Sequence, residues 1–359
     1  MGKTPRKLWV LSLFAMGLGA CSGEHIASAQ YGLDQCRRVA LLDQETGARI
    51  RGAEDLALDE ERGRLFVSAY DRRAVENAAR KRRNTLPQGG VYAVPLASLF
   101  DPQQEQISVA SLASPDNFTG GLRPHGISFD DVNHELVFIN RTYIRDGGKW
   151  VMVPQLQRIG ANGEMFVGEP VAAHCAANDV AAIDGGVVTS FTHASCGFGA
   201  GVENIFRLKR SGVSGENGAV FDKAAFANGV AITPGGDIVM AATRERALLF
   251  LEKMGEGLHE ALRIEIPGGP DNLSLATDGG VVAAAHPSMM KLMFNRKFGI
   301  GKAPSRIVKA DPDTGAVEIL FDDPRAELFS AATVAVETPG GLVAGSVTDE
   351  GLLVCQAAP

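Results

Sequence analysis

Residues 227–243, ANGVAITPGGDIVMAAT, decide the fold that we expect of this chain. The stretch reads as a short strand, a turn built from proline and glycine, and a second apolar strand. Two strands joined by such a turn form a β-hairpin. One hairpin is therefore predicted here, and the rest of the chain repeats it.

Similar hairpins occur six times along the chain. The other five copies are AEDLALDEERGRLFVSAY (53–70), PHGISFDDVNHELVFINRT (124–142), ANDVAAIDGGVVTSFTHA (177–194), DNLSLATDGGVVAAAH (271–286) and FSAATVAVETPGGLVAGSV (329–347). The equivalent positions, separated by 71, 53, 50, 44 and 60 residues, are Glu54, His125, Asn178, Asn228, Asn272 and Ala332. A four-stranded blade with its loops takes about 40–50 residues. The repeats therefore predict an all-β fold, a six-bladed β-propeller around a central tunnel.

The cysteines fit the closure of such a ring. Besides Cys21, the chain carries Cys36, Cys175, Cys196 and Cys355, an even number for which three pairings are possible. A ring is closed when a strand from one terminus completes the last blade, and a Cys36–Cys355 disulfide would join the first strand to the last. Cys175 and Cys196 bracket the third hairpin, so we expect them to pair with each other.

Zinc is the alternative for the local pair, with His174, Cys175, His193 and Cys196 as ligands. Adjacent residues on an extended chain point in opposite directions, so His174 and Cys175 would not readily bind one ion. We therefore expect the disulfide.

The N-terminus predicts export and a lipid anchor. Three basic residues precede the apolar run LWVLSLFAMGL (8–18), which is too short to span a bilayer. LGAC, ending at Cys21, resembles a bacterial lipobox, whose cysteine becomes the lipidated first residue of the mature protein. An ordinary signal peptide with an unrelated cysteine is the alternative.

From these features we expect a signal peptide over 1–20, a linker over 21–35 and the propeller over 36–359. An acylated cysteine would hold the protein at a membrane of a bacterial envelope, on its periplasmic or surface side.

Charge argues against a nucleic-acid partner. The 359-residue chain has a net charge of −7, and removing residues 1–20 with their three positive charges lowers it to −10. An acidic protein binds nucleic acid poorly. The one basic cluster, RKRR at 80–83, is predicted to be a solvated loop.

Oxygen-bearing side chains begin most repeats. The first strand of each blade lines a propeller's tunnel, so these residues are expected to point toward one axis. Apart from His125, they are Glu54, Asn178, Asn228 and, in the fifth repeat, Asp271 with Asn272. Carboxylate and amide oxygens are the ligands that Ca²⁺ takes, whereas Zn²⁺ prefers nitrogen or sulfur. The pattern predicts a calcium ion.

A second layer is predicted deeper in the tunnel. Asp55 and Asp179 each follow a candidate ligand, and neighbours on an extended chain face opposite ways. Together they could hold another ion; the alternative is that both cap turns.

Several of these motifs resemble the serum paraoxonase (arylesterase) family of calcium-dependent lactonases. The similarity runs in register from about Cys36 to Cys355, through GAEDLAL, RPHGIS, ANDVAAI, FANGVAI and PDNLSL. It implies a six-bladed propeller with two calcium ions in the tunnel, here as a bacterial lipoprotein member of the family.

The resemblance also implies roles for single residues. The residues that match the catalytic-calcium ligands are Glu54, Asn178, Asn228, Asp271 and Asn272. Asp55, Asp179 and the backbone carbonyl of Ile127 match the structural calcium site, and His125 matches the first histidine of a proposed catalytic dyad. The family's free cysteine is replaced by Ala285, before His286 and Pro287.

The second dyad histidine is missing. If 126–129 pairs with 136–139, facing residue numbers sum to about 265, so His125 faces Asn140 or Arg141. His134 lies in the turn, roughly 17 Å along the hairpin, and cannot be the partner.

In the family alignment the second histidine corresponds to Arg141, and arginine cannot relay a proton. We therefore expect that His125 acts alone as the base or that calcium-bound water is the nucleophile. Arg141 would lower the pKa of His125 or hold a substrate carbonyl or product carboxylate. His193 and His286 are expected in the tunnel wall.

Three functions fit these features. The first is a calcium-dependent hydrolase of small lactones, with aryl ester and organophosphate hydrolysis as side activities. The second is a sugar lactonase of the gluconolactonase (SMP-30-like) type, whose single-metal pattern does not call for Asp55, Asp179 or the Cys36–Cys355 pair. The third is a calcium-stabilised propeller that only binds. A strictosidine-synthase-like enzyme would leave the oxygen ligands unexplained.

Overall fold

A computed structural model of the chain describes residues 28–163, 169–183, 186–215, 218, 220–255 and 257–357. The expected signal peptide and the lipobox Cys21 lie outside these residues, as does the expected linker up to residue 27.

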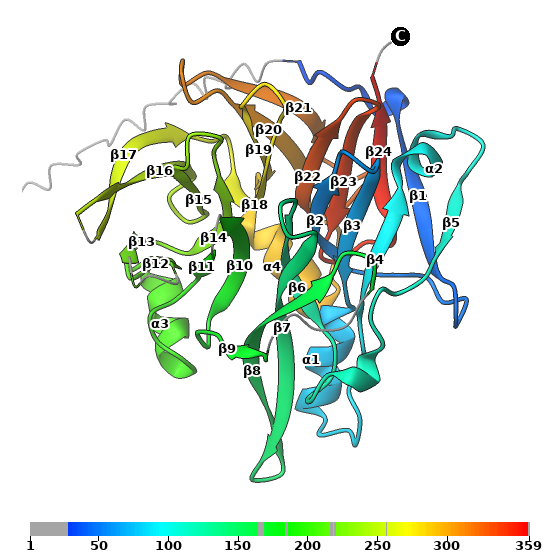
Figure 1. The fold of residues 1–359 in the computed structure, drawn as a ribbon, viewed down its shortest axis with the longest axis vertical. Helices are drawn as coiled ribbons and strands as arrows, with labels where there is room; N and C mark the ends of the chain where they lie inside the picture. The colour runs from blue at the N-terminus through cyan, green and yellow to red at the C-terminus, as the bar shows by residue number, and fades with distance from the viewer. Residues whose placement is uncertain are drawn as a thin grey trace, which may run out of the picture.

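Six sheets of the described residues stand around one axis and form a six-bladed β-propeller, which confirms the predicted fold class (Figure 1). The innermost strands, each in contact with the next around the ring, are β2 (Ala53–Asp59), β6 (Pro124–Asp130), β10 (Ala177–Ile183), β14 (Ala227–Ile232), β18 (Gly269–Leu275) and β22 (Ala332–Thr338).

The six predicted hairpins are the two inner strands of the blades. The second strands are β3 (Arg64–Ala69), β7 (Glu135–Asp146), β11 (Gly186–Phe191), β15 (Ile238–Ala242), β19 (Val281–His286) and β23 (Gly341–Ser346). The outer strands are β4 (Gly90–Pro95), β8 (Lys149–Gly160), β9 (Val171–Ala172), β12 (Ser211–Gly215), β13 (Val220–Ala224), β16 (Ala247–Met254), β17 (Gly257–Glu265), β20 (Ser305–Ala310), β21 (Val317–Asp323), β24 (Leu352–Gln356), β1 (Cys36–Asp43) and β5 (Gln106–Val109).

Three helices gather at one end of the ring. They are α1 (Arg72–Arg80), α3 (Phe198–Phe206) and α4 (Met289–Phe298), and each directly follows the second strand of a blade. In an antiparallel hairpin the second strand ends beside the start of the first, so these helices lie where the innermost strands begin. We call this end the mouth face; Figure 1 shows α1, α3 and the long β7–β8 hairpin there. The other helices of the described residues are α2 (Leu96–Phe100) and 3₁₀ turns at Leu33–Gln35 and Pro115–Asn117.

The N-terminal strand closes the ring, as predicted. β1 runs antiparallel to β24 with Cys36 opposite Cys355, and the two cysteines form a disulfide. Cys175 and Cys196 form the second disulfide, which confirms the local pairing over the zinc alternative.

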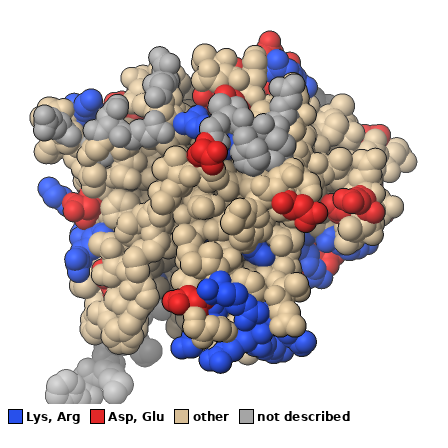
Figure 2. Space-filling model, turned by 60° about the horizontal axis from the view of Figure 1, so that its bottom comes forward, with Lys and Arg blue, Asp and Glu red and all other residues tan. Residues whose placement is uncertain are grey.

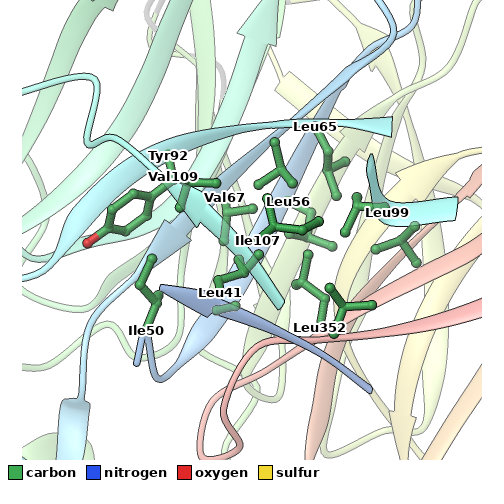
Figure 3. Close-up of a cluster of buried hydrophobic side chains, with 14 of the residues drawn as sticks. Leu41, Ile50, Leu56, Leu65, Val67, Tyr92, Leu99, Ile107, Val109 and Leu352 are labelled. Atoms are coloured by element: carbon green, nitrogen blue, oxygen red, sulfur yellow. The ribbon is translucent and has the colours of Figure 1, made fainter. Parts of the chain in front are cut away.

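Apolar side chains fill the joint between the first and last blades. Leu41 and Leu352 come from the closing strands, Leu56 and Leu65 from the first hairpin, and Ile107 from β5 (Figure 3). All five are buried. Because their strands come from both ends of the chain, this core forms only when the ring closes.

Every innermost strand has an irregular register near its start. Pairing with the second strand shifts between Ala53 and Asp55 in the first blade, and at the same place in the other five. Such bulges re-aim side chains. Two of the predicted equivalent positions are therefore wrong by one residue. In the sixth blade the residue in the bulge is Thr333 rather than Ala332, and in the fifth blade the first residue of the bulge is Asp271 rather than Asn272.

Glycine at two of these bulges lets neighbouring blades approach closely. A Cβ at Gly126 would lie 2.4 Å from the Cα of Asp179, and one at Gly229 would lie 2.5 Å from the carbonyl oxygen of Asp271. Backbone atoms cannot yield as a flexible side chain can, so the innermost strands would have to separate.

Replacing Gly126 by alanine is therefore expected to lower the free energy of unfolding by about 1–3 kcal/mol, as overpacking does. Gly201 lies within α3 with no atom within 4 Å of a built Cβ. Its replacement by alanine should instead stabilise by about 0.5–1 kcal/mol. Urea unfolding of both variants checks the contrast; equal effects would contradict a close approach at Gly126.

Candidate active site in the tunnel

Side chains from five consecutive blades touch one another around the axis of the tunnel. Glu54 contacts Nδ1 of His125, whose Nε2 lies 3.0 Å from Oδ1 of Asn178. Asn178 in turn donates to Asn228, and Asn228 to Asp271. All five side chains are buried. The bulges thus bring together the residues that the repeats placed at equivalent positions.

The gap between the fifth blade and the first is bridged through the backbone of Glu54. Its carbonyl oxygen accepts hydrogen bonds from Nδ2 of Asn272 at 2.9 Å and from Oγ1 of Thr333 at 2.8 Å. Thr333 therefore holds the ring from the sixth blade, a role that the sequence interpretation gave to no residue there.

The two aspartates of the predicted second layer face each other. Asp55 and Asp179 are buried and their side chains are hydrogen-bonded to one another. Each also accepts from neighbouring backbone: Asp55 from the N–H of Ile127 and Asp179 from that of Val230, both at 2.8 Å. The N–H of Ile127 thus contacts Asp55, and the role of its carbonyl as a calcium ligand, which the resemblance implied, stays a prediction.

Burial and proximity change the acidity of these carboxyls. Burial, and next the charge of Asp179, raise the pKa of Asp55 well above its usual range. Burial likewise raises the pKa of Asp179 to about 7 and also raises that of Asp271. A protein interior that holds this many carboxylates is electrostatically suited to a cation.

His125 lies where a neutral base is expected. Burial, and next the charge of Arg141, lower the pKa of His125 to about 4, which outweighs the opposite effect of Glu54. The imidazole is therefore neutral at pH 7 and able to accept a proton. This agrees with the predicted effect of Arg141 on His125.

Arg141, at the position of the missing dyad histidine, also reaches the tunnel. The residue is only 5% exposed, and its guanidinium donates to the hydroxyl of Tyr70 and to Oδ1 of Asn178, both at 3.2 Å. Ile127 pairs with Phe138 in the predicted register. Of the two candidates to face His125, Asn140 instead accepts from the N–H of Arg123.

Three other histidines, His286, His193 and His134, lie in different environments. His286 is buried in the tunnel wall and its Nε2 lies 2.7 Å from Oδ2 of Asp271. His193 is half-buried, bonded to Thr192 and packed edge-on against Phe226. His134 is an exposed turn residue with a φ of 54°, which confirms that it is no partner of His125.

The donor set of the tunnel fits a hard cation such as Ca²⁺. Its oxygens come from carboxylates and amides, and Oδ1 of Asn272 is a buried acceptor that no hydrogen-bond donor of the described residues reaches. Buried acceptors rarely lack a partner. Those that would hold the ion are Glu54, Asn178, Asn228, Asp271 and Asn272, with Asp55 and Asp179 at the second position. The binding of calcium by these residues stays a prediction.

Sequence reasoning missed the residues that follow the second strands. Tyr70, just before α1, accepts from Arg141, and the charge of Arg72, at the start of α1, acts on Glu54. Arg296 of α4 contacts Glu76 of α1. The antiparallel hairpin alone could have found them, because whatever follows a second strand returns to the mouth face.

Fold and site together define a six-bladed propeller with an acidic tunnel and a neutral histidine. No protein-family model matches the chain, and neither does any curated protein. Solved structures with a similar fold include a gluconolactonase from Xanthomonas campestris, 15% identical with a TM-score of 0.47, over 86% of this chain and 90% of that one.

Another is the periplasmic gluconolactonase of Pseudomonas aeruginosa, 12% identical with a TM-score of 0.47, over 89% of this chain and 92% of that one. A functionally unknown protein from Desulfotomaculum acetoxidans is 12% identical with a TM-score of 0.42, over 87% and 91% of the two chains. These likenesses extend to the fold alone. Two of the three are named gluconolactonases, and none is described as a paraoxonase.

Proposed function

We propose that this protein is a calcium-dependent hydrolase of lactones. The observation that carries the proposal is the buried chain of oxygen-bearing side chains, drawn from five blades, with a neutral histidine among them. Bound Ca²⁺ would polarise the lactone carbonyl and stabilise the negative charge that develops on its oxygen.

The chain's own residues would supply the rest of the chemistry. His125 accepts a proton from the attacking water, because its pKa of about 4 keeps it unprotonated at pH 7. Glu54 contacts Nδ1 and so orients the ring, which leaves Nε2, 3.0 Å from Oδ1 of Asn178, as the nitrogen that takes the proton. Arg141 donates to the same Oδ1 of Asn178 that lies beside His125, a position from which it can bind a substrate oxygen or the carboxylate of the product.

Hydrolysis of a panel of lactones by residues 22–359, with Ca²⁺ and with a chelator, tests the proposal. We expect turnover that the chelator abolishes and added Ca²⁺ restores. The panel also separates the finer alternatives: gluconolactone for the sugar lactonase, and aliphatic or acyl-homoserine lactones with phenyl acetate for the paraoxonase-like enzyme. Calcium binding without turnover of any substrate would favour the binding module.

The second layer provides a structural test of the same ion chemistry. A ligand present at 100 times its dissociation constant stabilises a fold by about 2.7 kcal/mol. Ca²⁺ should therefore raise the melting temperature, and the rise should shrink when Asp55 is replaced by asparagine. A rise of the same size in that variant would place the stabilising ion elsewhere.

Replacing His125 by glutamine separates its two possible roles. If His125 is the base, kcat should fall by about 100-fold or more, since general bases contribute 10²–10⁴. Calcium binding, measured by calorimetry, should change little because glutamine keeps a hydrogen-bonding end. Unchanged kcat would remove His125 as the base.

We also propose that the protein works outside the cytoplasm, anchored through Cys21. The disulfides support export, because such bonds persist in oxidising compartments. The helices of the described residues include none with the length and apolar character needed to span a membrane. Mass spectrometry of the mature N-terminus tests the anchor: an unmodified Cys21 would exclude it.

A further inference from the structure

Three arginines from three blades gather at the mouth of the tunnel. Arg72 lies at the start of α1, Arg141 on β7 and Arg296 near the end of α4. Nε of Arg72 and Nη1 of Arg296 both lie 3.2 Å from the same oxygen, Oε1 of Glu76. Two guanidinium groups therefore share one carboxylate, which leaves an excess of positive charge.

The cluster retains hydrogen-bond donors without partners. Among the described residues, Glu76 is the one hydrogen-bond acceptor of the Arg72 and Arg296 guanidiniums. Nε of Arg141 is buried and also has no acceptor. Arg72 and Arg296 are 24% and 29% exposed, so a dissolved molecule can reach them. An unpaired buried donor is costly unless a ligand satisfies it.

The cluster lies close to the residues that line the tunnel. The charge of Arg72 acts on Glu54, His125 and Asp271, which belong to three different blades. Arg141 touches Asn178 directly, at 3.2 Å. The positive groups are crowded: the charge of Arg72, ahead of burial, lowers the pKa of Arg296 to about 10.

Holding α1 against α4 does not require these three residues. The neighbouring Arg73 already joins the two helices, with donors 3.1 Å and 2.7 Å from the carbonyl oxygens of Arg296 and Asn295. A purely structural role would therefore leave the second and third guanidiniums, and their free donors, unexplained.

We propose that Arg72, Arg141 and Arg296 bind an anionic group, a carboxylate or a phosphate, carried by the lactone substrate. The planar donor pattern of guanidinium matches both groups. Exposed basic residues at 80–83 continue from α1, and Figure 2 shows a basic patch on this side of an otherwise acidic protein. Such a patch would attract anions toward the mouth. The inference rests on the proposed lactone hydrolysis and names its substrate class.

A pair of lactones that differ only in one phosphate tests the inference. We expect kcat/KM for 6-phosphogluconolactone to exceed that for gluconolactone, and Arg72→Gln to lower the ratio of the two by about tenfold. Arg296→Gln should act in the same direction. Arg62→Gln, an exposed change in the turn between β2 and β3 at the end of the ring away from the mouth face, should leave the ratio unchanged. A ratio that Arg72→Gln does not alter would overturn the inference.

Binding of the hydrolysed acids separates this result from failure of the proposed function. Calorimetry should show that 6-phosphogluconate binds more tightly than gluconate, and that Arg72→Gln removes most of the difference. Binding of this kind without turnover would retain the anion site and reject the lactonase. Equal binding of the two acids, with turnover intact, would reject the anion site alone.

Discussion

Replacing Asp271 by alanine is expected to lower kcat/KM for calcium-dependent lactone hydrolysis by at least about 100-fold. Asp271 is one of two carboxylates in the buried chain of side chains and also bonds to His286 at 2.7 Å. Its loss would remove both a charged oxygen ligand and the partner of that histidine. Losing a single preorganised electrostatic contact can cost 10²–10³ in rate, and a ligand should cost no less.

The Asp271→Asn variant separates the effect of the charge from that of the side chain's shape, because asparagine keeps the shape but removes the charge. We expect an intermediate activity and weaker calcium binding. Asp59 is the matched control: it is equally buried, pairs with Arg64 at 2.7 Å, and lies at the far end of β2. Asp59→Asn should lower stability without lowering kcat/KM. Full turnover and calcium binding in Asp271→Ala would reject the metal assignment.

Removing the ring-closing disulfide should have the largest effect on stability. Cys36 and Cys355 are separated by 319 residues, and closing so long a loop is worth about 5 kcal/mol in the chain-entropy model. The Cys36→Ser, Cys355→Ser double variant should therefore lose several kcal/mol of unfolding free energy. Backbone pairing of β1 with β24 would still favour closure and limit the loss.

The local disulfide provides the comparison for this prediction. Cys175 and Cys196 are separated by 21 residues, for which the same model gives about 3 kcal/mol. Urea unfolding of both double variants measures the difference. If removal of the local bond costs more than removal of the ring-closing bond, loop closure is not the source of the stabilisation.

The fold could be predicted because its signals are local. Each hairpin carries its own turn residues and apolar strands within about 20 positions, and the spacing between copies sets the number of blades. The bulges could not be predicted, because they depend on contacts between blades. For that reason the sixth position was placed at Ala332, although Thr333 is the residue that bonds to Glu54.

The candidate site likewise contains residues that the repeat predicts and residues that it does not. The oxygen-bearing residues stand at repeated positions, so their convergence follows from the repeat. The arginines of α1 and α4 do not. Glu76 and Arg296, in contact at 3.2 Å, are 220 residues apart in the chain. Neither segment carries a sequence signal that predicts this contact.

The position of the chain ends has a consequence for how the protein would sit on a surface. The backbone of Gln30 and Tyr31 pairs with β21, and β24 ends beside the start of β23. Figure 1 shows these segments at the end of the ring opposite α1 and α3. A tether at either end, whether a lipid on Cys21 or an immobilisation tag, would attach the protein at the end of the ring opposite the mouth face. The tunnel would then open toward the water, and substrates would arrive from solution rather than from the bilayer.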